Sequence, residues 1–163
     1  MHIKLKKNQP MNFKKIIIII ILIIVIIQLK RINKTNPEFD VKQDYITLSN
    51  APRDISILLK ISCYDCHSNQ TNYPWYINIS PVSWFVANHI KDGRQHLNFS
   101  EWGTYTLKKR TKKLEECVTE LEGVEMPLSS YTLMHTKAKL SAENKVALIK
   151  WFHRNPEKDL IQN

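Results

Sequence analysis

The chain has 163 residues, 43% of them apolar, which is enough for one domain with extensions. Its fifteen aromatic residues can close a small core, and its three glycines argue against a β-rich fold with many tight turns. Much of the formal charge of +9 comes from residues 1–30, which hold six lysines and no acid. The rest has 18 basic and 15 acidic residues, so we expect no nucleic-acid partner.

The first predicted element is a membrane anchor at residues 1–31. Lysines precede twelve unbroken aliphatic residues at 16–27, and Lys30 and Arg31 close the run. This order is typical of a secretory signal, and since no small-x-small cleavage site follows, we expect an uncleaved signal anchor. A helix over residues 14–29 would span about 24 Å of a hydrocarbon core of about 30 Å, a difference that snorkelling lysines can cover.

The charge around the apolar run predicts the topology. More positive charge precedes the run than follows it, so the N-terminus should stay cytoplasmic. We therefore expect an inner-membrane anchored protein whose domain faces the periplasm. A polar linker at residues 32–49, a helical domain at 50–155 and a tail at 156–163 complete the predicted organisation.

Helical periodicity dominates the predicted domain. A helix should start at Ala51-Pro52 and run directly into Cys63 and His67, with apolar residues at three- and four-residue spacing, which places the motif at its C-terminal end. Further helices are expected from Pro81 or Ser83 to about Gly93 and at 104–121. A short helix around Met134 and a final helix capped by Ser141 follow. The fold class is therefore all-α.

Residues 63–67 read C-x-x-C-H, the pattern for covalent attachment of a c-type haem. Cys63 and Cys66 lie about one helical turn apart, so both can reach the vinyl groups on one porphyrin edge. His67 then falls beneath the ring as a proximal iron ligand. Attachment at this motif occurs outside the cytoplasmic membrane in bacteria, in agreement with the predicted topology.

Two other readings of the motif stay open at this point. A thioredoxin-like dithiol also uses C-x-x-C, but it expects a preceding strand where this sequence predicts a helix. A structural zinc site needs four ligands, and only Cys117 and scattered histidines could complete one. Cys117 lies in an apolar helical stripe and is expected to pack as a small apolar residue.

The residues after the motif supply candidates for a haem pocket. Tyr73, Trp75 and Trp84 belong to an aromatic cluster that could wall a flat apolar macrocycle. Arg94 and His96 are candidates to bind the haem propionates, because arginine grips a carboxylate with two donors.

Met126-Pro127 is the second informative site. A thioether on an extended loop is a usual sixth ligand opposite the histidine, and His/Met ligation is typical of cytochromes c. We therefore predict iron ligation by His67 and Met126. His89, Met134 and His135 are weaker rivals for the sixth position.

Several motifs together resemble the small bacterial haem-binding domain, a c-type cytochrome-like family common in Bacteroidetes. They are C-Y-D-C-H-S-N (63–69), T-x-Y-P-W-Y (71–76), I-x-P-x-S-W (79–84), H-I-x-x-G-R-x-H-L-N-F-S-x-W (89–102), M-P-L-x-x-Y (126–131) and A-x-L-S (138–141). The resemblance covers roughly residues 45–155. It implies a small cytochrome c-like helical domain around one haem c, attached at Cys63 and Cys66, with His67 as proximal and Met126 as distal ligand.

The leading functional hypothesis is a membrane-anchored monohaem electron carrier, which is not an enzyme and implies a redox partner protein. The alternative is a haem-based sensor or peroxidase-like protein with a displaceable distal ligand, where His89 or His96 would be the distal polar group. The sequence shows no convincing acid/base pair for oxygen–oxygen cleavage. A thiol redox module without haem is the third hypothesis.

Overall fold

The computed structural model describes residues 12–154, and this part of the chain is helical, without strands. The predicted all-α class is confirmed. Two compact units are present: residues 34–74 with 88–154 form the larger one, and residues 12–33 with 75–87 the smaller. Residues 1–11 of the predicted anchor and the predicted tail at 156–163 lie outside the described residues.

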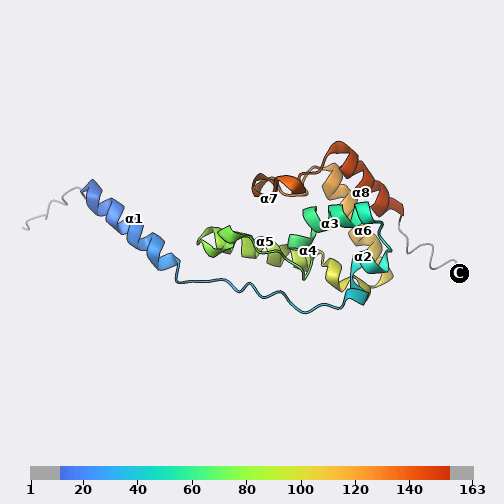
Figure 1. The fold of residues 1–163 in the computed structure, drawn as a ribbon, viewed down its shortest axis with the longest axis horizontal. Coiled ribbons are helices and arrows are strands. Elements are labelled where there is room, and N and C mark those ends of the chain that lie inside the picture. Colours follow the sequence, from blue (N-terminus) through green and yellow to red (C-terminus); the bar gives the residue numbers. More distant parts are fainter. Residues whose placement is uncertain (1–11, 155–163) are drawn as a thin grey trace, which may run out of the picture. The chain divides into compact units, whose positions relative to one another are not determined.

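The larger unit is built on three helices, α3 (Arg53–Ser62), α6 (Leu107–Glu122) and α8 (Ala142–Arg154). Helix α8 packs against both α6 and α3 (Figure 1). Apolar residues recur at three- and four-residue spacing on each helix, so each buries one face. The buried residues are Ile55, Leu58, Leu59, Leu114, Val118, Leu121, Leu148, Trp151 and Phe152.

Shorter elements complete this unit. They are η1 (Val41–Gln43), α2 (Tyr45–Leu48), α4 (Tyr64–His67), η3 (Phe99–Thr104), α7 (Ser129–Met134), η4 (Thr136–Ala138) and the second half of α5 (Val82–His96). Aromatic rings join several of them to the core. The Tyr45 ring lies 4.7 Å from that of Trp102, edge-on, and 5.1 Å from that of Phe99.

The segment predicted as a linker, residues 32–49, differs from that expectation over its second half. Helices η1 and α2 form there, and Tyr45 is 1% exposed in the core. The side chain of Asp44 caps α2 by accepting a hydrogen bond from the Ile46 amide at 3.0 Å. A single buried aromatic residue in a polar stretch leaves no periodic pattern, which is why the sequence did not indicate a helix here.

Side-chain caps set other helix boundaries. Ser141 Oγ accepts from the Asn144 amide at 3.2 Å, which confirms the predicted cap of the last helix. Thr106 Oγ1 accepts from the Lys109 amide at 3.3 Å, so α6 begins after Thr106 rather than at Thr104. Helix α5 continues through Gly93 to His96, past its predicted end.

The smaller unit contains α1 (Phe13–Ile27), η2 (Trp75–Asn78) and the first turns of α5. Every aliphatic side chain of α1 from Ile17 to Ile26 is exposed, on all sides of the helix. Within residues 12–154, no helix combines the length and the apolar character needed to cross a bilayer.

Candidate haem site

The prediction of one helix running through Cys63 and His67 was wrong. The C-x-x-C-H motif forms a separate helical turn, because the helix before it breaks at Cys63. The backbone of Cys63 has φ −126° and ψ −41°, outside the helical range, so α3 ends at Ser62 and α4 starts at Tyr64. The carbonyl oxygen of Cys63 accepts from the amides of Cys66 at 3.2 Å and His67 at 2.9 Å. The turn places Cys63, Cys66 and His67 on the wall of one cavity.

The two residues between the cysteines tie this turn to different parts of the fold. Tyr64 is buried; its ring stacks on Phe99 at 5.3 Å, and its hydroxyl donates to Asp44 Oδ1 at 2.9 Å. Asp65 Oδ2 accepts a hydrogen bond from the Tyr131 hydroxyl on α7 at 2.7 Å. The motif is therefore joined both to the core and to the segment that follows Met126.

The Tyr64–Asp44 bond predicts a pH-dependent stability. Burial raises the pKa of Asp44, and hydrogen bonds from Tyr64, Ile46 and Gln70 partly oppose the rise. The folded protein therefore binds the Asp44 proton more tightly than the unfolded chain does, whose pKa is 3.8. This stabilises the folded protein at low pH, and the stabilisation is lost as pH rises from 3.8 through the raised folded-state pKa. Removing one donor to the buried carboxylate should raise that pKa further.

We therefore expect Tyr64→Phe to lower the free energy of unfolding by about 2 kcal/mol at neutral pH. The loss should shrink at acidic pH, where Asp44 is protonated. Urea denaturation across a pH series measures both effects. Tyr73→Phe, at a partly exposed tyrosine, is the control and should change stability by less than about 0.5 kcal/mol. Equal losses at acidic and neutral pH would contradict this role of the Tyr64 hydroxyl.

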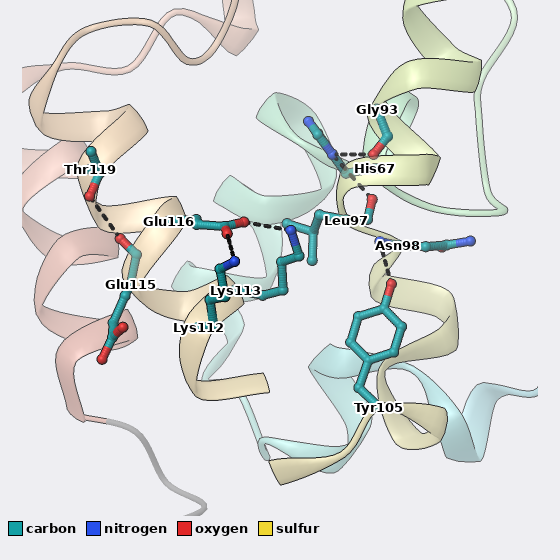
Figure 2. A network of polar contacts seen from close by, with 10 residues as sticks. All are labelled: His67, Gly93, Leu97, Asn98, Tyr105, Lys112, Lys113, Glu115, Glu116 and Thr119. Atoms are coloured by element: carbon teal, nitrogen blue, oxygen red, sulfur yellow. Dashed lines mark hydrogen bonds and ion pairs between the residues drawn. The ribbon is translucent and has the colours of Figure 1, made fainter. Parts of the chain in front are cut away.

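His67 is held in one orientation and one tautomer. Its Nδ1 lies 3.0 Å from the carbonyl oxygen of Gly93 and 3.2 Å from that of Leu97 (Figure 2). Carbonyl oxygens only accept, so Nδ1 carries the proton of the neutral ring. Burial lowers the pKa of His67, which favours this neutral form. The ring therefore presents an unprotonated Nε2, as an iron ligand must.

Gly93 explains why α5 comes close enough to orient His67. A Cβ atom at Gly93 would lie 2.7 Å from the carbonyl oxygen of Cys66 and 3.2 Å from its Cβ, so only glycine fits against the motif. The sequence suggested Gly93 as a helix end. The structure uses it inside the helix for a close approach of two backbones.

The cavity next to this motif has a volume of about 730 Å³, within the usual range for cofactor pockets. Elements α4, α5 and α6 and residues 126–131 contribute its walls. The apolar wall residues are Leu97, Phe99, Leu121, Pro127, Leu128 and Phe152. A neutral imidazole, two adjacent thiols, a thioether and apolar walls fit the chemistry of a haem.

Met126 lies on the cavity wall, as does Tyr131 five residues later. The chain reverses after α6 through Val124, whose φ of 62° is strained for a branched residue. The amides of Glu125 and Met126 donate to the Glu120 carbonyl at 3.0 and 3.3 Å. These bonds fix the approach of Met126 to the cavity.

The other predicted site residues lie elsewhere. Tyr73 is not among the residues lining the cavity, and Trp75 and Trp84 belong to the smaller unit. Arg94 is also outside the cavity wall: its guanidinium donates to the carbonyl of Ser68 at 2.8 Å, to Asn36 Oδ1 at 2.9 Å and to Thr71 Oγ1 at 2.8 Å. These bonds hold the loop after His67, and its role toward a propionate stays a prediction.

Cys117 joins the cavity wall from α6 and packs against the hydrophobic core, as its apolar stripe predicted. Burial is the main reason why the thiol pKa is raised at all three cysteines, to about 12 for Cys63 and about 11 for Cys66. Reactive dithiols need lowered pKa values, so these values disfavour the thioredoxin-like reading. Among residues 12–154, no group of three or more His, Cys, Asp or Glu side chains is placed to hold a metal ion.

Two lysines on α6 were not predicted as site residues. Lys112 and Lys113 line the cavity, and both contact Glu116 (Figure 2). Their side chains are 73% and 16% exposed, so Lys113 is the one largely enclosed. From the sequence, the charged residues at 108–116 are expected to form a solvated helix face. Nothing in their spacing indicates that Lys112 and Lys113 line a cavity while the neighbouring lysines do not.

These features define a class: an all-helical domain whose cavity offers a neutral imidazole, two thiols and a thioether to a flat apolar cofactor. The chain belongs to the haem-binding domain family, whose model matches residues 22–154. This confirms the resemblance seen in the motifs, and the protein is a haem-binding protein. No curated protein and no solved structure matches the chain.

Proposed function

We propose that this haem-binding protein is a monohaem c-type cytochrome-like electron carrier. Its haem is attached through thioether bonds to Cys63 and Cys66, and its iron is ligated by His67 and Met126. The observation that carries the proposal is the fixed His67 tautomer in the cavity that Met126 also lines. The haem would supply a one-electron couple, while His67 and Met126 would bind its iron and the apolar cavity walls would exclude water.

The chain's contacts support a rigid ligand set. Tyr131 bonds to Asp65 inside the C-x-x-C-H motif, so the segment after Met126 is tied to the segment that carries His67. Neither imidazole nor thioether carries charge, an arrangement that favours the reduced iron. Because both ligands sit on fixed backbone, a change of oxidation state requires little rearrangement.

Met126→Ala tests this ligation directly. We expect the haem-loaded variant to lose the low-spin, six-coordinate visible spectrum and its midpoint potential to fall by about 100 mV or more. Met134→Ala is the matched control, since Met134 is exposed at the end of α7 and outside the cavity wall. An unchanged spectrum and potential in Met126→Ala would overturn His/Met ligation, while leaving haem attachment intact.

Lys112 and Lys113 are the cationic candidates for the propionates. They are the lysines of the described cavity wall, which contains no arginine and includes the acids Asp65, Asp92, Glu116 and Glu120. A dianionic porphyrin edge is attracted to the lysines and repelled by the acids. Lys113 is the more enclosed of the two, so its charge acts through less water.

Lys113→Gln is expected to lower the midpoint potential by about 40 mV, equivalent to about 1 kcal/mol for one electron. Loss of a nearby positive charge disfavours the state that has gained an electron. Lys108→Gln, on the same helix but outside the cavity wall, removes the same charge and should leave the potential almost unchanged. Equal shifts in both variants would show a general charge effect and contradict the placement of the propionates.

A second candidate function is a haem sensor or peroxidase-like protein with a displaceable distal ligand. It is favoured by His89 and His96, which also line the cavity. Rapid binding of carbon monoxide or cyanide, or turnover of peroxide, would support it over electron transfer.

The proposed carrier is attached to a membrane by its N-terminal segment and works on the periplasmic side of an inner membrane with a redox partner protein. Support comes from α1, whose exposed aliphatic surface would be costly in water. Its 15 residues correspond to about 22 Å of helix. Lysines at positions 14, 15 and 30 flank the aliphatic run, where they can reach lipid headgroups.

A further inference from the structure

The smaller unit joins the end of α1 to the loop between η2 and α5. Gln28 forms a reciprocal pair with the backbone of Ser80: Nε2 donates to the Ser80 carbonyl at 2.9 Å, and Oε1 accepts from the Ser80 amide at 2.9 Å. Arg31 donates to the carbonyl of Asn78 at 2.8 Å. This loop is therefore fastened to the residues that end the aliphatic helix.

Trp84 adds a third attachment to the same place. Its indole Nε1 donates to the Lys30 carbonyl at 3.0 Å, and the Lys30 ammonium lies 5.6 Å from the centre of its ring. The contact is a cation–π interaction at the predicted boundary of the apolar run. Trp84 was predicted to wall a haem, and these bonds give it a role in holding the loop against α1.

The segment around this loop, from Trp75 in η2 to Phe85 in α5, carries exposed apolar side chains. Trp75 is 70% and Phe85 54% exposed, and Ile79 and Val82 are exposed to a lesser degree. The aliphatic residues of α1 are exposed in the same unit. The unit therefore presents apolar side chains both on α1 and on residues 75–85, which are fastened to the end of α1.

The charge of this unit indicates what covers these side chains. Residues 12–33 and 75–87 contain Lys14, Lys15, Lys30 and Arg31 and no acidic residue. Aromatic and aliphatic side chains beside cations, without acids, match the interface of a bilayer with anionic headgroups. The family match starts at residue 22, so it includes both the end of α1 and this loop.

We propose that residues 75–85 form a membrane-interface element, which inserts Trp75, Ile79, Val82 and Phe85 among the lipid headgroups beside the end of α1. The inference rests on the membrane attachment proposed above. It adds a second contact with the lipid, contributed by the haem-binding part of the sequence, and assigns Gln28 as the residue that positions it.

Site-specific photocrosslinking tests this contact. The full-length, haem-loaded chain is reconstituted in vesicles of phosphatidylethanolamine and phosphatidylglycerol, with p-benzoylphenylalanine replacing Trp75 or Phe85. The same replacement at Ile20 on α1 tests whether the helix itself contacts lipid. Leu133 on α7, an apolar residue of the larger unit that is 78% exposed, is the matched negative control. Mass spectrometry after irradiation identifies lipid and protein adducts.

We expect lipid adducts at positions 75, 85 and 20 and almost none at 133. Adding Gln28→Ala should reduce the adducts at 85 about tenfold, since it removes both hydrogen bonds between Gln28 and Ser80, while those at 20 persist. Lipid adducts at 20 alone would overturn the inference and leave anchoring intact. Adducts between two copies of the chain at 75 or 85 would identify a self-association surface instead and also overturn it. Absence of adducts at 20 would overturn anchoring and the inference together.

Discussion

His67→Ala is expected to abolish the low-spin haem spectrum and to reduce the yield of haem-loaded protein severely. The variant loses the Nε2 ligand that the carbonyls of Gly93 and Leu97 hold in position. No other imidazole is expected to replace it, because His67 directly follows the two attachment cysteines. The visible spectrum of protein from cells that mature c-type cytochromes measures the effect.

Two other histidines of the cavity wall provide matched controls. His89→Ala and His96→Ala also remove an imidazole from the cavity, but neither residue is adjacent to the attachment cysteines in the sequence. Both variants should retain the spectrum of the parent protein. If His67→Ala kept a six-coordinate spectrum, or if His96→Ala lost it, the assignment of the axial ligands would be wrong.

Gly93→Ala should destabilise the domain by about 3 kcal/mol, the upper range for an overpacked contact. The added Cβ would lie 2.7 Å from the backbone oxygen of Cys66, which cannot move without moving the motif. Helix α5 would then be displaced, together with the carbonyl that orients His67. Urea denaturation and the haem yield should report the loss in parallel.

Gly123→Ala is the control for this substitution. Gly123 ends α6 with φ −68°, and a Cβ there would meet the Thr119 carbonyl oxygen at 3.2 Å, a milder contact at an exposed position. Its effect should stay below about 1 kcal/mol. Similar losses in the two variants would show that close packing of α5 on the motif is not what makes Gly93 necessary.

The sequence was informative where chemistry and spacing coincide. The C-x-x-C-H turn and Met126, sixty residues apart, both line the cavity. Each could be predicted because its sequence signature is recognisable without knowledge of the fold. Helices α3, α6 and α8 were predictable from apolar spacing, and the cap of the last one from Ser141. The packing of Cys117 followed from its place in an apolar stripe.

Long-range contacts could not be predicted in the same way. The close approach of Gly93 to Cys66, the bond from Tyr131 to Asp65 and the burial of Tyr45 each join segments distant in the sequence. Arg94 illustrates the difficulty: its charge suggested a propionate partner, yet its described partners are a carbonyl, an amide and a hydroxyl of its own chain. Burial and partners of a polar side chain depend on packing that a single sequence does not display.

The central claim is a haem bound covalently to Cys63 and Cys66. The most direct test is the intact mass, after denaturation, of full-length protein from cells able to mature c-type cytochromes, with the double variant Cys63→Ser/Cys66→Ser and the control Cys117→Ser beside it. The account predicts the mass of one haem on the parent and on Cys117→Ser, and none on the double variant. A parent chain of unmodified mass with free thiols at Cys63 and Cys66 would contradict it.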